Sequence, residues 1–174
     1  MIIDNNFLTD SQKDFLDNTV CDNSFPFYPQ KYSVAKHIDQ TKFLCHVVVS
    51  WENAKSEIRC DLWPKFEDIL ATFCKKHNIK LNEVYRCAVN YTYNNGVEKC
   101  AVHNDHLFSH KQLLICCNDV VDKNAKTVLL DDDEKTVLSE IEPKQYQGVC
   151  YDTKPHYMVY PKVGERIMIV YTFA

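Results

Sequence analysis

The sequence predicts a mainly β fold of the α+β class: a double-stranded β-helix (jelly roll) packed by N-terminal helices. Two observations lead to this prediction. The chain changes character near residue 80, because two helical patterns precede this point and short strand patterns separated by turns follow it. A run of about eight short strands after two helices is typical of an antiparallel double sheet covered by helices on one face. At 174 residues, the chain is expected to form one domain.

Residues 1–80 are expected to form a helical support region. The segment TDSQ at residues 9–12 is a capping box, and it predicts a short helix. Residues 43–50 form an apolar run typical of a buried strand. A longer helix is predicted over residues 62–77, because Pro64 suits a first helical turn and large apolar residues recur at helical spacing.

Residues 81–174 are expected to form the jelly-roll core. Asn-Asn-Gly at residues 94–96 favours a hairpin turn, and the acidic run at residues 131–134 is typical of a solvated loop. The predicted strands cover residues 84–93, 99–103, 111–117, 127–130, 136–141, 148–152, 157–160 and 166–173.

The composition excludes several classes of protein. The chain has only 3 glycines, and none of them forms the closely spaced sets that P-loop and dinucleotide-binding motifs require. The formal net charge of −4 argues against a nucleic-acid partner. We find no apolar run long enough for a membrane span and no signal-peptide pattern at the N-terminus. The 9 cysteines include no C-x-x-C pair, so we expect free thiols in a reducing cytoplasm.

Two histidines and one carboxylate are the strongest candidates for a metal site. His103 and Asp105 stand two residues apart, and such residues face the same side of an extended segment. His156 begins a late strand and could supply a third ligand. Two histidines and a carboxylate on one face of an octahedron are typical of non-haem Fe(II) oxygenases. Zinc hydrolases use similar ligands, so ligand type alone leaves the metal open.

Arg166 favours iron over zinc. It opens a strand of nearly pure core composition that contains no acidic residue. A buried guanidinium is costly unless a carboxylate faces it in fork geometry. A bound dicarboxylate could meet this need, with one end on the metal and the other on Arg166. H-x-D, a late histidine and an arginine are each weak signals, and their order along the chain carries the prediction.

The chain resembles the 2-oxoglutarate- and Fe(II)-dependent dioxygenases, especially the prolyl-4-hydroxylase-like branch with its small phage and bacterial members. The H-x-D…H…R combination carries most of the resemblance, which covers most of the chain. Softer matches lie at residues 2–9, 91–96, 113–119, 143–152, 155–156 and 164–166.

This resemblance implies an enzyme that hydroxylates a prolyl residue or a related peptide or amino-acid substrate and releases succinate and CO₂. Fe(II), 2-oxoglutarate and O₂ would be needed, with ascorbate as a candidate reductant. The implied ligands of Fe(II) are His103, Asp105 and His156. The protein would act in the cytoplasm, which is the host cytoplasm if a phage encodes it.

The resemblance also implies three residues that contact the cosubstrate. Arg166 would form a salt bridge with the far carboxylate of 2-oxoglutarate. Tyr93 stands where the family often has a tyrosine that lines the cosubstrate or substrate pocket, and Tyr91 on the same strand face is the reserve candidate.

Some positions depart from the family pattern. Cys116 stands where many relatives carry a tyrosine that binds the cosubstrate carboxylate. That hydrogen bond is either missing or comes from Thr127, Lys111 or a water. His106 and His110 complicate the choice of ligands, and we interpret both as loop residues near the mouth of the site, with plain solvent exposure preferred for His106.

Two rival functions stay open. The missing tyrosine is compatible with a non-catalytic jelly-roll binding module, and the same chemistry could act on a small molecule or a nucleobase. The expected partner is a protein, peptide or small-molecule substrate, with no membrane or nucleic acid. Substrate identity and oligomeric state depend on loop shapes and surfaces that one sequence does not define.

Overall fold

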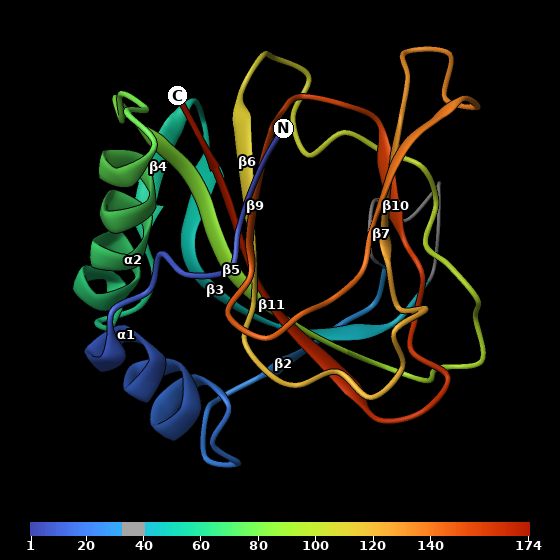
Figure 1. The fold of residues 1–174 in the computed structure, drawn as a ribbon, viewed down its shortest axis with the longest axis horizontal. Coiled ribbons are helices and arrows are strands. Elements are labelled where there is room, and N and C mark those ends of the chain that lie inside the picture. Colours follow the sequence, from blue (N-terminus) through green and yellow to red (C-terminus); the bar gives the residue numbers. More distant parts are fainter. Residues whose placement is uncertain (33–40) are drawn as a thin grey trace.

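Two antiparallel sheets facing each other form the centre of the computed structural model, which describes residues 1–32 and 41–174 (Figure 1). The strands of the larger sheet are β1 (Ile2–Asp4), β2 (Tyr28–Gln30), β3 (Phe43–Glu52), β4 (Lys55–Ile58), β5 (Val84–Tyr93), β6 (Lys111–Cys116), β9 (Gly148–Asp152) and β11 (Glu165–Phe173). Those of the smaller sheet are β7 (Thr127–Leu130), β8 (Val137–Ile141) and β10 (His156–Met158). The larger sheet has the order β1-β9-β6-β11-β5-β3-β2, with β4 on β3, and the smaller sheet has the order β10-β7-β8. The predicted mainly β jelly roll is confirmed.

The helices cover the outer face of the larger sheet, away from the smaller one (Figure 1). They are α1 (Asp10–Phe15), the π-helical turn η1 (Leu16–Val20) and α2 (Trp63–Lys76). The predicted capping box at the start of α1 is present, because the side chains of Thr9 and Gln12 each accept a hydrogen bond from the other residue's backbone N–H. None of the described helices is long and apolar enough to cross a bilayer.

Strand alternation gives the larger sheet two apolar faces. Side chains such as Ile115 and Ile169 point towards α2 and form the main core with it. Leu114 and Met168, each one residue away, point the other way and form a second core between the sheets. Under the helices the packing is tight: a Cβ on Gly148 of β9 would lie 2.7 Å from Cε1 of Phe7, so this position needs glycine. The surface between the two sheets is thus built by the even-numbered residues of β6 and β11.

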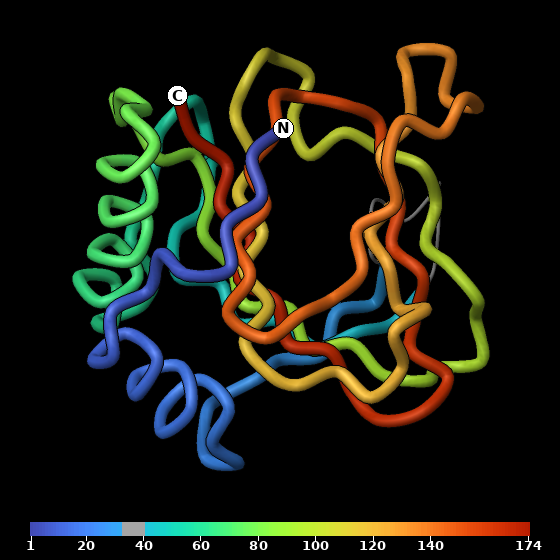
Figure 2. Tube along the Cα trace, in the orientation of Figure 1, coloured from blue at the N-terminus to red at the C-terminus, as the bar shows by residue number. Residues whose placement is uncertain are grey.

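The N-terminal region contributes more than the helical support that the sequence predicts. Residues 1–80 also supply β1, β2, β3 and β4, of which only β3 is expected from the sequence. Both β1 and β2 are three residues long, and β4 is exposed on all four residues. Strands this short carry too few residues for an alternating pattern to show. Because β1 pairs with β9 and β3 pairs with β5, the two regions share one sheet (Figure 2).

The strand predicted over residues 99–103 is wrong. The segment pairs with its neighbour at only two isolated positions, Lys99 with Val159 and His103 with His156. It therefore runs beside β10 as an irregular loop rather than as a ladder. This geometry still anchors His103 by two backbone hydrogen bonds of 3.0 Å and 2.9 Å to His156.

All 9 cysteines are free thiols, and most of them are buried in the two cores. Burial raises the pKa of Cys74 and Cys116 to about 11 and that of Cys150 to about 12. It raises the pKa of Cys87 and Cys117 well above the usual value. These groups therefore stay protonated in the folded chain at pH values where the unfolded chain ionises.

We expect the protein to lose stability in mild alkali because of these thiols. Their pKa is higher in the folded state, so their contribution is complete below the unfolded pKa of about 8.5 and is lost as the pH rises above it. Each such thiol lowers the free energy of unfolding by about 1.4 kcal/mol per pH unit in that range. Urea unfolding under reducing conditions at several pH values measures the slope. The variant Cys150→Val should reduce the slope by one thiol's share, and an unchanged slope would contradict the assignment.

Candidate metal centre

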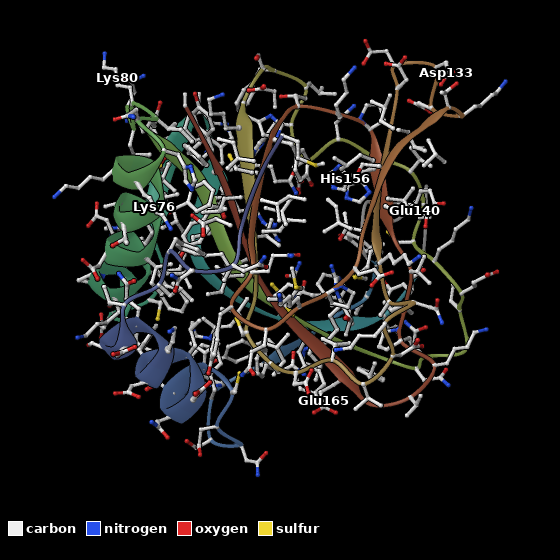
Figure 3. All side chains as sticks on the ribbon, in the orientation of Figure 1. Lys76, Lys80, Asp133, Glu140, His156 and Glu165 are labelled. Atoms are coloured by element: carbon white, nitrogen blue, oxygen red, sulfur yellow. The ribbon has the colours of Figure 1, made fainter. Side chains whose placement is uncertain are left out.

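Three side chains converge on the inner side of the smaller sheet, where Figure 3 labels His156. The nearest ligand atoms of His103, Asp105 and His156 all lie within 4.8 Å of one another. His156 is the first residue of β10, and the backbone bridge to His103 brings the two imidazole centroids to 4.5 Å. Asp105 follows two residues after His103 in the loop. The structure thus brings together the three residues that the sequence proposes as ligands.

Backbone carbonyls orient both imidazoles. Nδ1 of His103 lies 3.0 Å from the carbonyl oxygen of Ala101, and Nδ1 of His156 lies 3.0 Å from that of Lys154. Since a carbonyl oxygen only accepts, each Nδ1 carries the proton in the neutral ring and each Nε2 keeps a free lone pair. This is the usual arrangement of histidine ligands, in which a hydrogen bond on one nitrogen fixes the ring that binds metal through the other.

The Asp105 carboxylate completes a set that fits a divalent cation. Nε2 of His156 lies 3.4 Å from Oδ2 of Asp105, which is buried and has no hydrogen-bond partner in the described part of the chain. Burial lowers the pKa of His156 and so favours its neutral form, although the Asp105 charge opposes this effect. A lone pair facing a buried carboxylate oxygen is unfavourable without a cation between them. The donor set therefore fits a metal ion.

Protons compete with metal at this site. Burial alone lowers the pKa of His103, but a hydrogen bond with the Cys100 thiol and the charge of Asp105 outweigh it and raise the pKa to about 9. Burial raises the pKa of Asp105, but the charges of His156, Arg86 and His103 together hold it below its usual value. Metal binding near neutral pH should therefore release a proton from His103.

Arg166 is a buried cation with no anionic partner among the residues that the structure describes. Arg166 is 4% exposed, and it forms no ion pair with any of residues 1–32 and 41–174. Nη2 donates a 2.7 Å hydrogen bond to Oγ1 of Thr127, whereas Nε has no partner in the same range. Burial lowers the pKa of Arg166. An unneutralised guanidinium at this depth is costly, so a bound anion would stabilise it.

A cavity of about 280 Å³ between the two sheets connects Arg166 with the three candidate ligands. On the larger sheet, every second residue of β5 and β11 faces the cavity. Thr92 of β5 pairs with Arg166 of β11, and Asn90 pairs with Met168, so all four share the face that lines the cavity. Further lining comes from Phe43, Arg86, Cys100, Asn104, Gln112, Leu114, Thr127, Met158, Tyr160 and Val170.

The structure does not bring Tyr91 and Tyr93 to this cavity. Both lie on the opposite face of β5, because the residues that line the cavity are Asn90 and Thr92. Tyr91 packs with the core under the helices, and its ring centroid is 5.2 Å from that of Phe27. Tyr93 borders a separate surface depression. This geometry therefore gives no support to the expectation that Tyr93 or Tyr91 lies beside the cosubstrate. Residue spacing alone does not reveal which face of β5 points into the cavity.

Of the alternatives to the family's tyrosine, Thr127 is the one that contacts Arg166. Lys111 instead forms a 2.6 Å ion pair with Asp152, and Cys116 donates through Sγ to the carbonyl of Asn118 at 3.3 Å.

The two further histidines of the loop lie outside the triad. Nε2 of His106 is 2.7 Å from Oγ1 of Thr172. Plain solvent exposure is the preferred interpretation of His106 from the sequence, but the structure shows this residue half-buried. His110 is buried, with Nδ1 2.9 Å from the carbonyl oxygen of Phe108.

Comparisons with known proteins agree on the fold. No family model and no curated protein matches the sequence. Among solved structures, an oxidoreductase of the 2OG-Fe(II) oxygenase family from Burkholderia pseudomallei aligns with a TM-score of 0.68 and 13% identity, over 94% of this chain and 78% of that one. A prolyl hydroxylase from Trichoplax adhaerens, in complex with a peptide fragment of the hypoxia inducible factor oxygen degradation domain, aligns with a TM-score of 0.69 and 16% identity, over 99% and 82%. The viral collagen prolyl hydroxylase of Paramecium Bursaria Chlorella virus-1 gives 0.53 and 12%, over 98% and 93%. The chain thus has the fold of the 2-oxoglutarate oxygenases and prolyl hydroxylases.

Proposed function

We propose that the protein is an Fe(II)- and 2-oxoglutarate-dependent dioxygenase that hydroxylates a prolyl residue or a related peptide or amino-acid substrate. One observation carries this proposal. The buried Arg166, which has no anionic partner in the described chain, shares a single cavity with a convergent set of two histidines and one carboxylate. A metal site beside an isolated buried cation suits a ligand that is both a chelator and a dicarboxylate.

Each residue has a distinct role in this proposal. His103, Asp105 and His156 would hold Fe(II), and Arg166 with Thr127 would receive the far carboxylate of 2-oxoglutarate. When bound, Fe(II) supplies the activation of O₂. The balanced reaction puts one oxygen atom into the substrate hydroxyl and the other into succinate, and 2-oxoglutarate loses CO₂.

The chain's own contribution is orientation and exclusion of water. The backbone carbonyls of Ala101 and Lys154 fix both imidazoles, so the ligand set is preorganised before metal binds. Leu114, Met168 and Val170 form an apolar wall between the polar ends of the cavity. This wall limits water at the point where the substrate C–H bond must react.

A peptide substrate is supported by the Trichoplax relative, which is described as bound to a peptide fragment. Ascorbate would serve only to keep iron reduced. The free state of the cysteines supports a reducing compartment such as the cytoplasm.

The test is formation of succinate from 2-oxoglutarate by protein purified without oxygen and then supplied with Fe(II), ascorbate and O₂. We expect slow succinate formation without substrate and faster formation with a prolyl peptide. The variant Asp105→Ala is the inactive control. Absence of succinate from wild-type protein that binds metal would contradict the proposal and would favour a non-catalytic binding module.

A further inference from the structure

Arg86 is a second guanidinium on the cavity wall, and the proposed cosubstrate does not use it. It lies on β5, six residues before Thr92, and its cross-strand partner on β11 is Thr172. Since Thr92 pairs with Arg166, the two arginines share one face of the sheet and their backbones are about 20 Å apart along the strand. Both line the same cavity.

The candidate metal ligands lie on the Arg86 side of the cavity. Nη1 of Arg86 is 3.8 Å from Oδ1 of Asp105, and this is the only ion pair of Arg86 among the described residues. That pair is long for a charge-assisted hydrogen bond. In the proposed function the Asp105 charge is directed to the metal, so the positive charge of Arg86 is left without full compensation.

Arg86 can be reached by a ligand. Its side chain is 27% exposed, whereas Arg166 is only 4% exposed. Thr172 and Gln112 lie beside it in the next two strands. Oγ1 of Thr172 is taken up by Nε2 of His106 at 2.7 Å, whereas Gln112 lines the cavity, so Arg86 and Gln112 form a polar row at this end. The apolar wall of Val170 and Leu114 separates this row from the Arg166 end. The cavity therefore has two cationic ends, with the apolar side chains of Val170 and Leu114 between them.

We propose that Arg86 is a specificity-determining residue that binds a carboxylate of the substrate. This carboxylate is either the terminal carboxylate of a small amino-acid derivative or an acidic side chain of a peptide. Held at Arg86, it places the neighbouring carbon atoms of the substrate beside the metal ligands. The inference rests on the proposed function, because it assigns Arg166 to 2-oxoglutarate and leaves Arg86 to the substrate.

The three arginines of the chain allow a direct test by NMR. Arg59, Arg86 and Arg166 should give three side-chain Nε–Hε resonances, assigned by single lysine substitutions. The probes are cyclopentanecarboxylate and its neutral amide, cyclopentanecarboxamide, added to protein that holds Zn²⁺ and saturating 2-oxoglutarate. We expect the carboxylate to shift the Arg86 resonance saturably and the amide to leave it unmoved. Arg59 is the internal control, since it is surface-exposed and paired with Glu52 and Glu57.

A matched pair of variants extends the test. Arg86→Gln should weaken carboxylate binding by about tenfold or more, because it removes a hydrogen bond between charged groups. Arg59→Gln should leave the affinity unchanged. The shift of Arg166 on adding 2-oxoglutarate reports that each variant is folded. The proposal would be overturned if the Arg86 resonance of the wild-type protein does not shift with the carboxylate, or shifts equally with the amide. This outcome does not depend on whether Arg86→Gln folds.

Two further probes distinguish the sources of the carboxylate. N-acetyl-L-proline carries a terminal carboxylate, and acetyl-Pro-Asp-amide carries an acidic side chain. The one that shifts Arg86 at lower concentration identifies the source. The proposed function is judged separately by succinate formation, so an enzyme without carboxylate recognition and a carboxylate site without turnover give different results.

Discussion

Replacing His156 by alanine is expected to remove metal binding and to lower succinate formation by far more than the ~10- to 100-fold that loss of a supporting group around a metal costs. His156 supplies a lone pair from Nε2 to a site that has, among the described residues, only His103 and Asp105 as other donors. The carbonyl oxygen of Lys154 holds its Nδ1 and so directs Nε2 towards the other two ligands. The alanine side chain has no atom that could bind metal in its place. Metal content per chain after dialysis, together with the rate of succinate formation, measures the effect.

Two further variants make this result specific to the ligand role. His156→Gln keeps a polar side chain in the buried position and should preserve the fold while it still loses metal. His77→Gln changes a histidine at the end of α2 that bonds to Asp4, far from the cavity, and should keep wild-type metal content. Wild-type metal content in His156→Ala would exclude the triad.

The sequence predicts the parts of the fold that follow a local period. β5 is observed over the predicted residues 84–93, and α2 lies within the predicted helix, because alternating and helical patterns are local properties of the chain. The metal triad was proposed from the two-residue spacing of His103 and Asp105 and from a histidine at a strand start. Residues two positions apart stay close in space whatever the local backbone, so this prediction holds even though residues 99–103 form a loop with two bridges.

The inward face of β5 could not be predicted in the same way. Its residues are mixed on both faces, so alternation alone does not show whether Thr92 or Tyr93 points to the cavity. The pairing of Thr92 with Arg166 decides this, and it joins residues more than seventy positions apart. Arg86 is inward-facing for the same reason. Long-range register therefore separates the residues that sequence reasoning found from those it missed.

Replacing Arg166 by methionine is expected to stabilise the protein in the absence of 2-oxoglutarate while it abolishes the response to 2-oxoglutarate. Arg166 has one hydrogen bond from its guanidinium, to Thr127, and no carboxylate beside it in the described chain. Exchanging buried charged groups for apolar side chains of similar volume often stabilises a protein by about 1–4 kcal/mol. The loss of the Thr127 bond offsets roughly 1 kcal/mol of this gain, so we expect a net gain of up to about 3 kcal/mol.

Urea unfolding with and without 2-oxoglutarate, on protein loaded with Zn²⁺, measures both effects. A ligand at about 100 times its Kd should raise the free energy of unfolding of the wild type by about 2.7 kcal/mol, whereas Arg166→Met should not respond. Arg166→Lys is the matched control, because it keeps the charge but loses the planar fork, and it should respond only at higher concentration. A destabilised Arg166→Met would mean that the fold itself needs the guanidinium. Stabilisation with loss of the response would mean that the chain tolerates a costly buried charge because its ligand brings the missing carboxylate.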